Sequence, residues 1–350
     1  MDFLFPYLKW TNKLMLKIIN LITNNYFLNQ KLQVTSFEKP IRRLTDTWRG
    51  NTQKGRRILD EVHTTSNISN FHNFLFLRDL RAEGSLKARS TARTFVNNWI
   101  EEKHNLISKI YDVTAISSRI IVWSFSYTWF AESGERNFQK KLLNSIAFQA
   151  KYLELKLEKS NDSLERIIII KGIIIAKSIL YEEIKNINHL IELIDIELQF
   201  LVNKDGGHVT RSPVLQIQLL RHLIEIRSVI AVLKNIDTEN LHTCTIKMGE
   251  FCRSFQMPNE NLAWFNGGSI VSKDLIKQTL DRVGYKNKIF HIAEETGFCR
   301  ISNQDIVLMA DIGTKKNLKK QNKAGLFSFE FYYKKQKIIS NLGDVINSNT

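Results

Sequence analysis

The sequence contains few of the residues that build disulfide scaffolds and metal clusters. Its 350 residues include only three cysteines, Cys244, Cys252 and Cys299. An odd number of cysteines without a close pair argues against a disulfide framework, and their spacing matches no zinc motif. The sequence also lacks a phosphate-binding loop, a dinucleotide-binding fingerprint and a Gly-x-Ser-x-Gly elbow. We therefore expect no metal site and no organic cofactor.

Long apolar runs are missing as well. No stretch reaches the roughly 18 to 20 apolar residues that a membrane-spanning helix needs. Lys9, Lys13 and Lys17 interrupt the hydrophobic start of the chain, and no small-residue cleavage site follows, which argues against a signal peptide. Residues 1–34 instead predict an amphipathic helix over residues 8–28, which packs on the core or touches a membrane surface. The absence of a signal peptide favours a cytoplasmic chain.

Acidic residues are the scarcer charged class. The sequence has 50 Lys and Arg against 35 Asp and Glu, which gives a formal net charge of +15. Such a charge is typical of proteins that bind a polyanion, but it also fits a compositional bias toward Lys, Ile and Asn. No RNA-binding or helix-turn-helix signature accompanies the charge, so nucleic acid is not an expected partner. The hydrophobic fraction of 43% indicates a globular protein with a core.

Helical periodicity is what the chain has in abundance. Apolar residues at helical spacing predict helices over residues 71–81, 86–102, 104–130, 138–156, 164–184, 187–202, 214–234 and 241–255. Residues 160–163, which include Asp162, predict a turn and N-cap before the isoleucine-rich helix over residues 164–184, which should be buried on most faces. Residues 35–70 are polar and short of periodicity, and we interpret them as loop. Arg78 and Asp79 are adjacent on a predicted helix, so they point in different directions and are interpreted as structural partners of other helices. Successive helical hairpins are typical of an α-solenoid or a closed α/α barrel.

The pattern changes after residue 257. Alternating residues predict strands over residues 262–268, 288–292, 298–301, 305–311, 326–333 and 337–339, with a surface helix over residues 274–283. Glu330 is expected in the middle of an antiparallel sheet. The sequence therefore predicts a helical domain over residues 1–257 and a partial β domain over residues 258–350.

The clearest junction between a loop and a helix is the segment from Asp205 to Pro213. Asp205-Gly206-Gly207 is a turn signal, because glycine tolerates a positive φ angle. Ser212 is expected to cap the following helix, and Pro213 fits its first position. His208, which we expect to be exposed, and Arg211 would then lie at a helix N-terminus, which suits an anionic ligand. For Arg211 the alternative is a salt bridge to a neighbouring helix. The alternative is that this loop simply joins two packed helices.

Several motifs along residues 40–335 together resemble the bacterial heparinase II/III-like family. They are Leu77-Arg78-Asp79-Leu80-Arg81, Ala88-Arg89, Asn98-Trp99-Ile100, Asp205-Gly206-Gly207-His208 with Arg211-Ser212-Pro213 followed by Gln216, Leu219-Leu220-Arg221 and Arg227, Leu262-Ala263-Trp264-Phe265-Asn266-Gly267, and Ala324-Gly325 with Ser328-Phe329-Glu330. The resemblance implies a mainly α fold, an incomplete α/α toroid followed by an antiparallel β-sandwich. Relatives are usually longer, so we expect the sandwich to be partial. The family also implies a periplasmic or cell-envelope location, in conflict with the missing signal peptide.

The resemblance also implies polysaccharide lyase chemistry on an acidic polysaccharide. β-Elimination at a uronic acid needs a polar group that neutralises the carboxylate and a base that removes the C5 proton. His208 and Arg211 are the candidates for the base and for the carboxylate clamp. The candidate substrate contacts are Gln216, Lys171, Lys323 and Trp123, the last as a sugar-stacking ring or, alternatively, as a core aromatic residue.

The chain departs from the family at the positions that would carry this chemistry. Where lyases of the family often have Tyr-His after the Ser-Pro of the loop, this sequence has Leu215 and Gln216. Lys171 with Gly172 replaces the start of an Asn-bearing helix, and Lys323 replaces a histidine before the β strands. A protein that binds polysaccharide without cleaving it therefore remains the alternative hypothesis.

Overall fold

The computed structural model describes residues 35–61, 72–102, 112–233, 236–267, 269–283, 289–313 and 327–341. The amphipathic helix expected over residues 8–28 and the candidate residue Lys323 lie outside these described residues.

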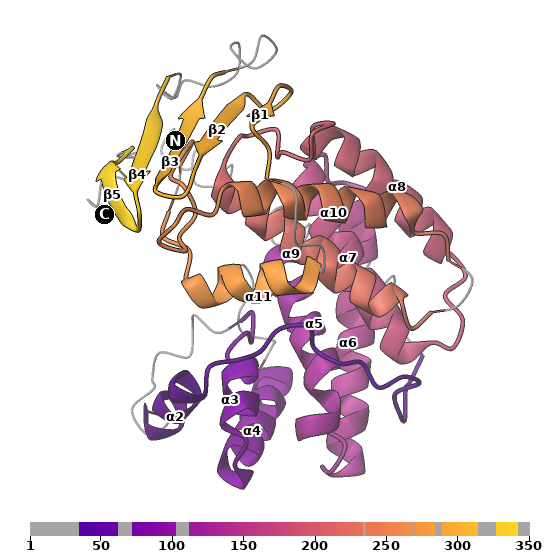
Figure 1. Ribbon diagram of the computed structural model, residues 1–350. Coiled ribbons are helices and arrows are strands. Elements are labelled where there is room, and N and C mark those ends of the chain that lie inside the picture. Colours follow the sequence, from indigo (N-terminus) through magenta and orange to yellow (C-terminus); the bar gives the residue numbers. More distant parts are fainter. Residues whose placement is uncertain are drawn as a thin grey trace, which may run out of the picture.

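Ten helices, arranged in two layers, make up most of the described chain (Figure 1). They are α2 (Thr52–Glu61), α3 (Leu77–Glu83), α4 (Leu86–Glu102), α5 (Val113–Phe130), α6 (Arg136–Leu157), α7 (Ser163–Leu180), α8 (Ile187–Leu201), α9 (Pro213–Ile230), α10 (Glu239–Ser254) and α11 (Lys273–Val283). Helices α3, α5, α7, α9 and α11 contact one another in that order, and α4, α6, α8 and α10 pack against them. This alternation of hairpins is the α/α toroid that the sequence predicts.

Helix α7 shows why the sequence forms these elements. The Asp162 side chain accepts a hydrogen bond from the Glu165 N–H and so caps the first turn, as the turn signal before the helix predicts. The isoleucines of residues 167–170 and 173–175 are all buried. Because α7 contacts α5, α6, α8 and α9, a helix that is apolar nearly all round is covered on nearly all sides. The isoleucine run thus forms the centre of the helical core.

The segment before α2 crosses the helices rather than forming a detached loop (Figure 1). The Ile41 N–H donates to the Ile179 carbonyl at the end of α7, and Thr47 Oγ1 lies 2.9 Å from Ser228 Oγ on α9. The prediction of loop over residues 35–70 is wrong for α2. A methyl group at Gly55 in α2 would lie only 2.3 Å from the Asp79 carbonyl oxygen, so glycine here permits close packing on α3.

The β region is one antiparallel sheet with the strand order β1-β2-β3-β4-β5. Its strands are β1 (Ile292–Ala293), β2 (Phe298–Ser302), β3 (Ile306–Asp311), β4 (Phe329–Tyr333) and β5 (Gln336–Ile339). Glu330 lies mid-sheet opposite Met309, as predicted, and Lys337 neutralises it across the β4–β5 pair at 2.8 Å. The strand expected over residues 262–268 is wrong, because the described residues there contain only the isolated bridge between Gln256 and Leu262.

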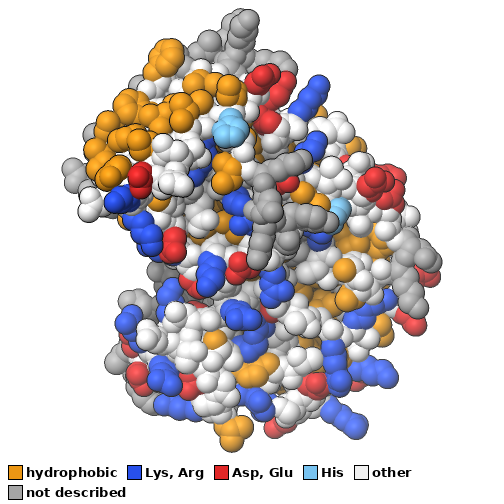
Figure 2. Space-filling view, in the orientation of Figure 1, with side chains coloured by type: hydrophobic (Ala, Val, Ile, Leu, Met, Phe, Trp, Pro, Cys, Tyr) orange, Lys and Arg blue, Asp and Glu red, His pale blue; other side chains and the backbone are white. Residues whose placement is uncertain are grey.

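The two faces of this sheet differ. One face is buried and carries Phe298, Met309 and Tyr332. The other face exposes apolar side chains, including Ile301 and Tyr333, and Figure 2 shows hydrophobic side chains gathered over this part of the molecule. Helix α11 follows the expected boundary at residue 257, yet it packs against α9 and α10.

In the part of the chain that the structure describes, no helix combines the length and apolar character needed to cross a bilayer. The three cysteines are free thiols.

Candidate functional site

The loop between α8 and α9 joins the helical layers to the sheet. Gly206 has a φ of 89°, and Pro213 begins α9, as the sequence predicts. The prediction that Ser212 caps α9 is wrong, because its side chain makes no capping hydrogen bond. The expected exposure of His208 is wrong too, since His208 is buried together with Arg211 and Ser212. The reason is the turn before β2, which covers the loop from the side of the sheet.

Arg211 connects this loop to the sheet instead of facing solvent. Its Nε donates to the Thr296 carbonyl at 2.8 Å, and its Nη2 donates to the Gly297 carbonyl and to the Asp311 carboxylate. The guanidinium also lies 5.2 Å from the centre of the Phe298 ring. Because Asp311 is fully buried, this ion pair holds β3 against the start of α9. The guanidinium is therefore already engaged at the position proposed for a carboxylate clamp.

His208 has a fixed tautomer. Its Nδ1 accepts a hydrogen bond from the Thr210 N–H at 3.2 Å and lies 2.8 Å from the Thr210 hydroxyl. The proton of the neutral imidazole therefore sits on Nε2, which is buried and has no hydrogen-bond partner among the described residues. Burial lowers the pKa of His208 to about 4. Neither nitrogen offers an exposed lone pair, so this geometry does not suit a general base without rearrangement of the loop.

Gln216 holds the loop closed. Its side-chain carbonyl accepts from the His208 N–H at 2.6 Å, and its side-chain amide donates to the Gly206 and Met248 carbonyls. The side chain is buried, and two of these bonds satisfy the His208 N–H and the Gly206 carbonyl, which the tight turn leaves without a partner in a regular element, while the third ties the loop to α10. We had expected a substrate contact at this position, and the structure gives Gln216 a scaffolding role.

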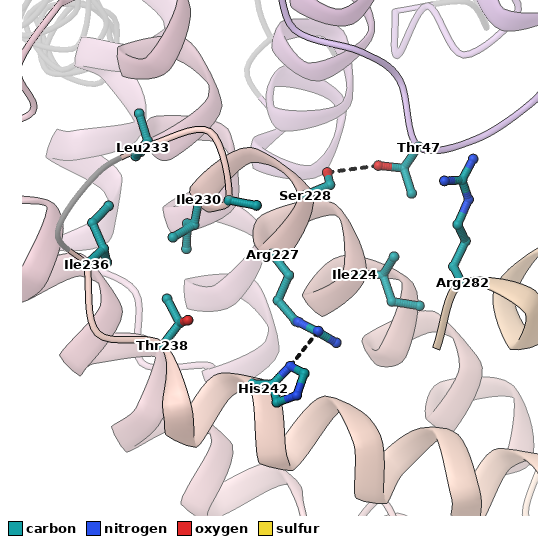
Figure 3. Close-up of a pocket in the computed structure, with 11 residues that line it drawn as sticks. Thr47, Ile224, Arg227, Ser228, Ile230, Leu233, Ile236, Thr238, His242 and Arg282 are labelled. Atoms are coloured by element: carbon teal, nitrogen blue, oxygen red, sulfur yellow. Dashed lines mark hydrogen bonds between the residues drawn. The ribbon is translucent and has the colours of Figure 1, made fainter. Parts of the chain in front are cut away.

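At its other end, α9 borders a cavity of about 430 Å³ (Figure 3). The last turns of α9, the start of α10, the segment around Thr47 and Arg282 at the end of α11 line it. Arg227 Nη2 lies 2.5 Å from His242 Nδ1 across the cavity wall. Apolar periodicity could not reveal this cavity, because it is formed by the ends of elements that are distant in sequence.

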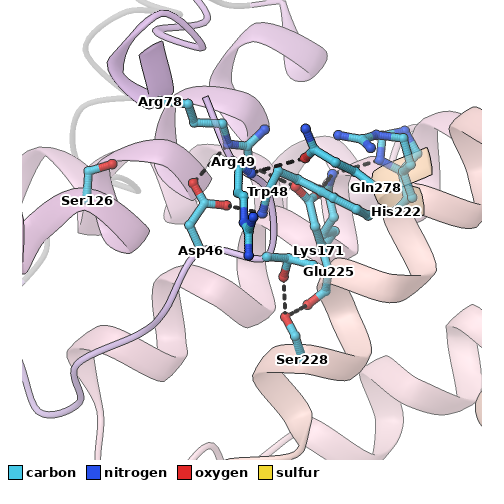
Figure 4. Close-up of polar contacts among 12 residues, drawn as sticks. Asp46, Trp48, Arg49, Arg78, Ser126, Lys171, His222, Glu225, Ser228 and Gln278 are labelled. Atoms are coloured by element: carbon cyan, nitrogen blue, oxygen red, sulfur yellow. Dashed lines mark hydrogen bonds and ion pairs between the residues drawn. The ribbon is translucent and has the colours of Figure 1, made fainter. Parts of the chain in front are cut away.

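The middle of α9 carries a buried cluster of charged groups (Figure 4). Glu225 accepts from Lys171 on α7 and from Arg78 on α3, at 2.7 and 2.9 Å. Asp46 accepts from Arg78 and from Arg81, at 2.9 and 2.8 Å. Arg78 thus bridges the two carboxylates, which confirms its interpretation as a structural partner of other helices.

The electrostatics of this cluster keep its charges paired. Burial by itself would raise the pKa of Glu225, but Lys171 and Arg78 outweigh it and hold that pKa well below its ordinary value. Burial lowers the pKa of Lys171, and the attraction of Glu225 opposes the shift. The Lys171 ammonium is almost completely buried and holds Glu225 in place, so a substrate cannot reach it as the cluster stands.

Two basic residues lie on the edge of this cluster and remain partly exposed. His222 Nδ1 lies 2.7 Å from Lys171 Nζ, and burial followed by the Lys171 charge lowers the pKa of His222 to about 3. Arg221 lies over the Trp48 ring at 3.6 Å from its centre and donates to Thr279 Oγ1. Sequence reasoning assigned no role to His222 or Arg221 in a site, although both interrupt an otherwise apolar helix.

Trp123 belongs to the core. It is fully buried, and the rings of Phe74 and Trp99 contact it edge-on at 5.2 and 5.4 Å between centroids. No face of its ring is open to a sugar. Among the described residues, no group of three His, Cys, Asp or Glu side chains is arranged to hold a metal ion.

Solved structures with the same architecture include heparan sulfate lyase HepC from Pedobacter heparinus, with a TM-score of 0.61 and 13% identity. This similarity covers 93% of the present chain and 61% of that lyase. A crystal structure of heparinase III has a TM-score of 0.62 at 13% identity and covers 91% of this chain and 62% of that one. The chain has the fold of the heparinase III-type lyases. It spans about three-fifths of the length of these heparinase structures.

No family model matches the sequence, and no curated protein sequence does. The structural comparison thus confirms the expected fold at 13% sequence identity, where comparison of sequences alone finds no match.

Proposed function

We propose that this protein binds an acidic polysaccharide and that the residues of the Asp205–Pro213 loop do not cleave it. The observation that carries the proposal is the basic surface made by Arg49 and Arg221 beside Trp48, with the neutral His222 ring next to it. Arg49 is exposed, and Arg221 and His222 are partly exposed. Neither arginine forms an ion pair with a carboxylate in the described chain, because Asp46 and Glu225 are paired with Arg78, Arg81 and Lys171. The two arginines therefore remain available to a polyanion.

The fold and the charge support the same conclusion. The heparinase structures named above share this architecture and are lyases of a sulfated polysaccharide or are called heparinase in their own right. The net charge of +15 favours a long anionic chain as the partner. The groups that the family resemblance assigns to catalysis are instead Leu215, Gln216 and the ion-paired Lys171, so binding is the better supported activity.

The test compares binding and cleavage on the same sample. Heparin, heparan sulfate and alginate are offered to the protein, and affinity is measured over a range of salt concentrations by calorimetry. We expect binding that weakens steeply with salt, because the contacts are between charges. Arg49→Gln should weaken binding several-fold, whereas Arg136→Gln, an equal charge change at an exposed position of α6, should not. Binding that does not depend on salt, or equal affinities for both variants, would contradict the proposal.

A second candidate is β-elimination at the same surface, and the adjacency of Arg221 and His222 favours it. At this surface Arg221 would neutralise a uronate carboxylate, and the neutral His222 ring would donate a hydrogen bond from Nε2 to the leaving oxygen. Elimination breaks the C5–H and C4–O bonds: water takes the C5 proton and returns one to the leaving oxygen, so an unsaturated uronate forms. Ultraviolet absorbance of that product on any of the three polysaccharides, lost in His222→Gln, would establish the lyase and displace the binding-only proposal.

A further inference from the structure

The cavity at the C-terminal end of α9 is lined by basic and apolar groups but by no carboxylate. Arg227, Arg282 and His242 are its ionisable side chains, and Thr47, Ser228 and Thr238 contribute hydroxyl groups. Neither arginine is ion-paired to a carboxylate of the described residues. Its volume of about 430 Å³ is in the range of small-molecule sites.

The contact between Arg227 and His242 sets the hydrogen-bonding character of the wall. A guanidinium can only donate, so His242 Nδ1 accepts and the proton of the neutral ring lies on Nε2. Burial lowers the pKa of Arg227, and no acidic neighbour offsets that shift. A charged group held in a partly buried wall without a counterion is stabilised by an anion that enters the cavity.

The other side of the cavity is apolar. Figure 3 places Ile230, Leu233 and Ile236 at one end and Arg282 at the other, with Arg227 between them. The hydrogen bond between Thr47 and Ser228 at 2.9 Å closes the wall toward the Asp46 cluster. An inorganic anion would satisfy the arginines but would leave this apolar surface in contact with water.

We propose that this cavity binds a small organic anion in which a carboxylate or a sulfate is attached to an apolar body. The anionic group binds Arg227 beside His242, Arg282 adds a second positive charge to the cavity lining, and the apolar body covers the isoleucines. The proposal does not depend on polysaccharide binding, because the cavity and the Arg49–Arg221–His222 surface use different side chains.

Calorimetry with four probes tests both halves of the proposal. Hexyl sulfate and hexanoate carry both features, sodium sulfate carries only the charge, and hexanol carries only the apolar chain. We expect one saturable site for hexyl sulfate or hexanoate and at least about tenfold weaker binding of the other two probes, since a charge-assisted contact and an apolar contact are each lost. Which of the two organic anions binds more tightly distinguishes a carboxylate ligand from a sulfate ligand. Equal affinity for hexanol and hexyl sulfate would overturn the assignment of an anion site.

Matched variants locate the site. Arg227→Gln should weaken binding of the better organic anion by about tenfold, because it removes a charge-assisted hydrogen bond. Arg282→Gln should weaken it less, because it removes a positive charge elsewhere in the lining. Arg136→Gln makes the same charge change at an exposed position far along the sequence and should leave the affinity unchanged. Circular dichroism confirms that the variants are folded. No saturable binding by the parent, or unchanged affinity in both cavity variants, would refute the proposal, whatever the outcome of the polysaccharide experiments.

Discussion

An arginine and a histidine lie at each end of α9, and the two pairs have opposite surroundings. At the N-terminal end, Arg211 and His208 are buried against the sheet, and the Arg211 guanidinium is bound to Asp311. At the C-terminal end, Arg227 and His242 face a cavity and have no described carboxylate as partner. The first pair holds two parts of the chain together, and the second is free to meet a ligand. Residue type and position along the helix therefore do not show whether an arginine is structural or available to a ligand. The presence or absence of a paired carboxylate does.

The largest effect that should follow from this difference is the loss of Arg211. Arg211→Gln leaves the fully buried Asp311 without its cation, and breaking a buried ion pair in this way costs about 3 to 5 kcal/mol. The free energy of unfolding, measured by urea denaturation, should fall by that amount. Adding Asp311→Asn should restore part of the loss, since the unpaired charge is then absent. A fall of less than about 1 kcal/mol would mean that the Arg211–Asp311 tie is not a buried ion pair in solution.

The next effect is a dependence of stability on pH at the same end of α9. The pKa of His208 is about 4 in the folded protein, against an ordinary value of 6.5. The unfolded chain therefore binds more protons between these values, so stability is fully present above pH 6.5 and declines as pH falls toward 4. The difference amounts to about 3 kcal/mol by the lower end of this window.

His208→Asn is the control for this pH dependence. Asparagine can accept the Thr210 N–H bond but does not titrate, so the variant should lose less stability than the parent between neutral pH and pH 4. His222, whose pKa burial also lowers, is present in both proteins, so its contribution cancels when the two stability curves are compared. Parallel stability curves for the two proteins would show that His208 is not a buried neutral imidazole.

A smaller loss is expected for Gln216. Gln216→Ala removes three hydrogen bonds and leaves the His208 N–H and the Gly206 carbonyl without a partner, whereas the Met248 carbonyl lies within α10. Unsatisfied buried groups of this kind cost about 1 to 3 kcal/mol, of which water entering the vacated space recovers a part. Thermal denaturation should show the loss, and hydrogen exchange should show it concentrated in residues 203–211. Uniform exchange across α9 and the loop would contradict a local role.

The smallest effect should come from the other end of the helix. Arg227→Gln removes a cation that borders a cavity and pairs with no described carboxylate, so the free energy of unfolding should change by no more than about 0.5 kcal/mol. The loss in free energy of unfolding for this variant, compared with the loss for Arg211→Gln, measures the difference between the two ends of α9. A loss as large as that of Arg211→Gln would place Arg227 among the structural arginines.

Sequence reasoning recovered what depends on local pattern. The isoleucine run of α7, the Asp162 cap, Pro213 at the start of α9 and the mid-sheet position of Glu330 each follow from period or capping chemistry. Helix α2 escaped notice because only Gly55 and Leu59 are buried in it, which is too few for an apolar stripe.

The site was harder to predict, because its decisive partners are remote in sequence. Arg211 and Asp311 are 100 residues apart, and no local sequence pattern near either residue indicates that they pair. Lys171 and Glu225 meet only because α7 and α9 pack together. The sequence could therefore identify an unusual loop, but not that the sheet would bury it. Arg227, His242 and Arg282 were assigned to no common site for the same reason, since three separate elements bring them to one cavity.

The φ of 63° at Arg211 has a consequence for how freely this position can vary. That backbone conformation favours glycine or asparagine, whereas the contacts with Asp311 and two carbonyl groups require a guanidinium. The local preference and the tertiary preference conflict, so the position is frustrated. In a saturation scan of position 211, glycine would relieve the backbone strain but lose the ion pair with Asp311. Lysine would keep the charge but lose the planar guanidinium that donates to several acceptors at once. No single substitution at position 211 should match the stability of the parent, so the scan should tolerate arginine and no other residue.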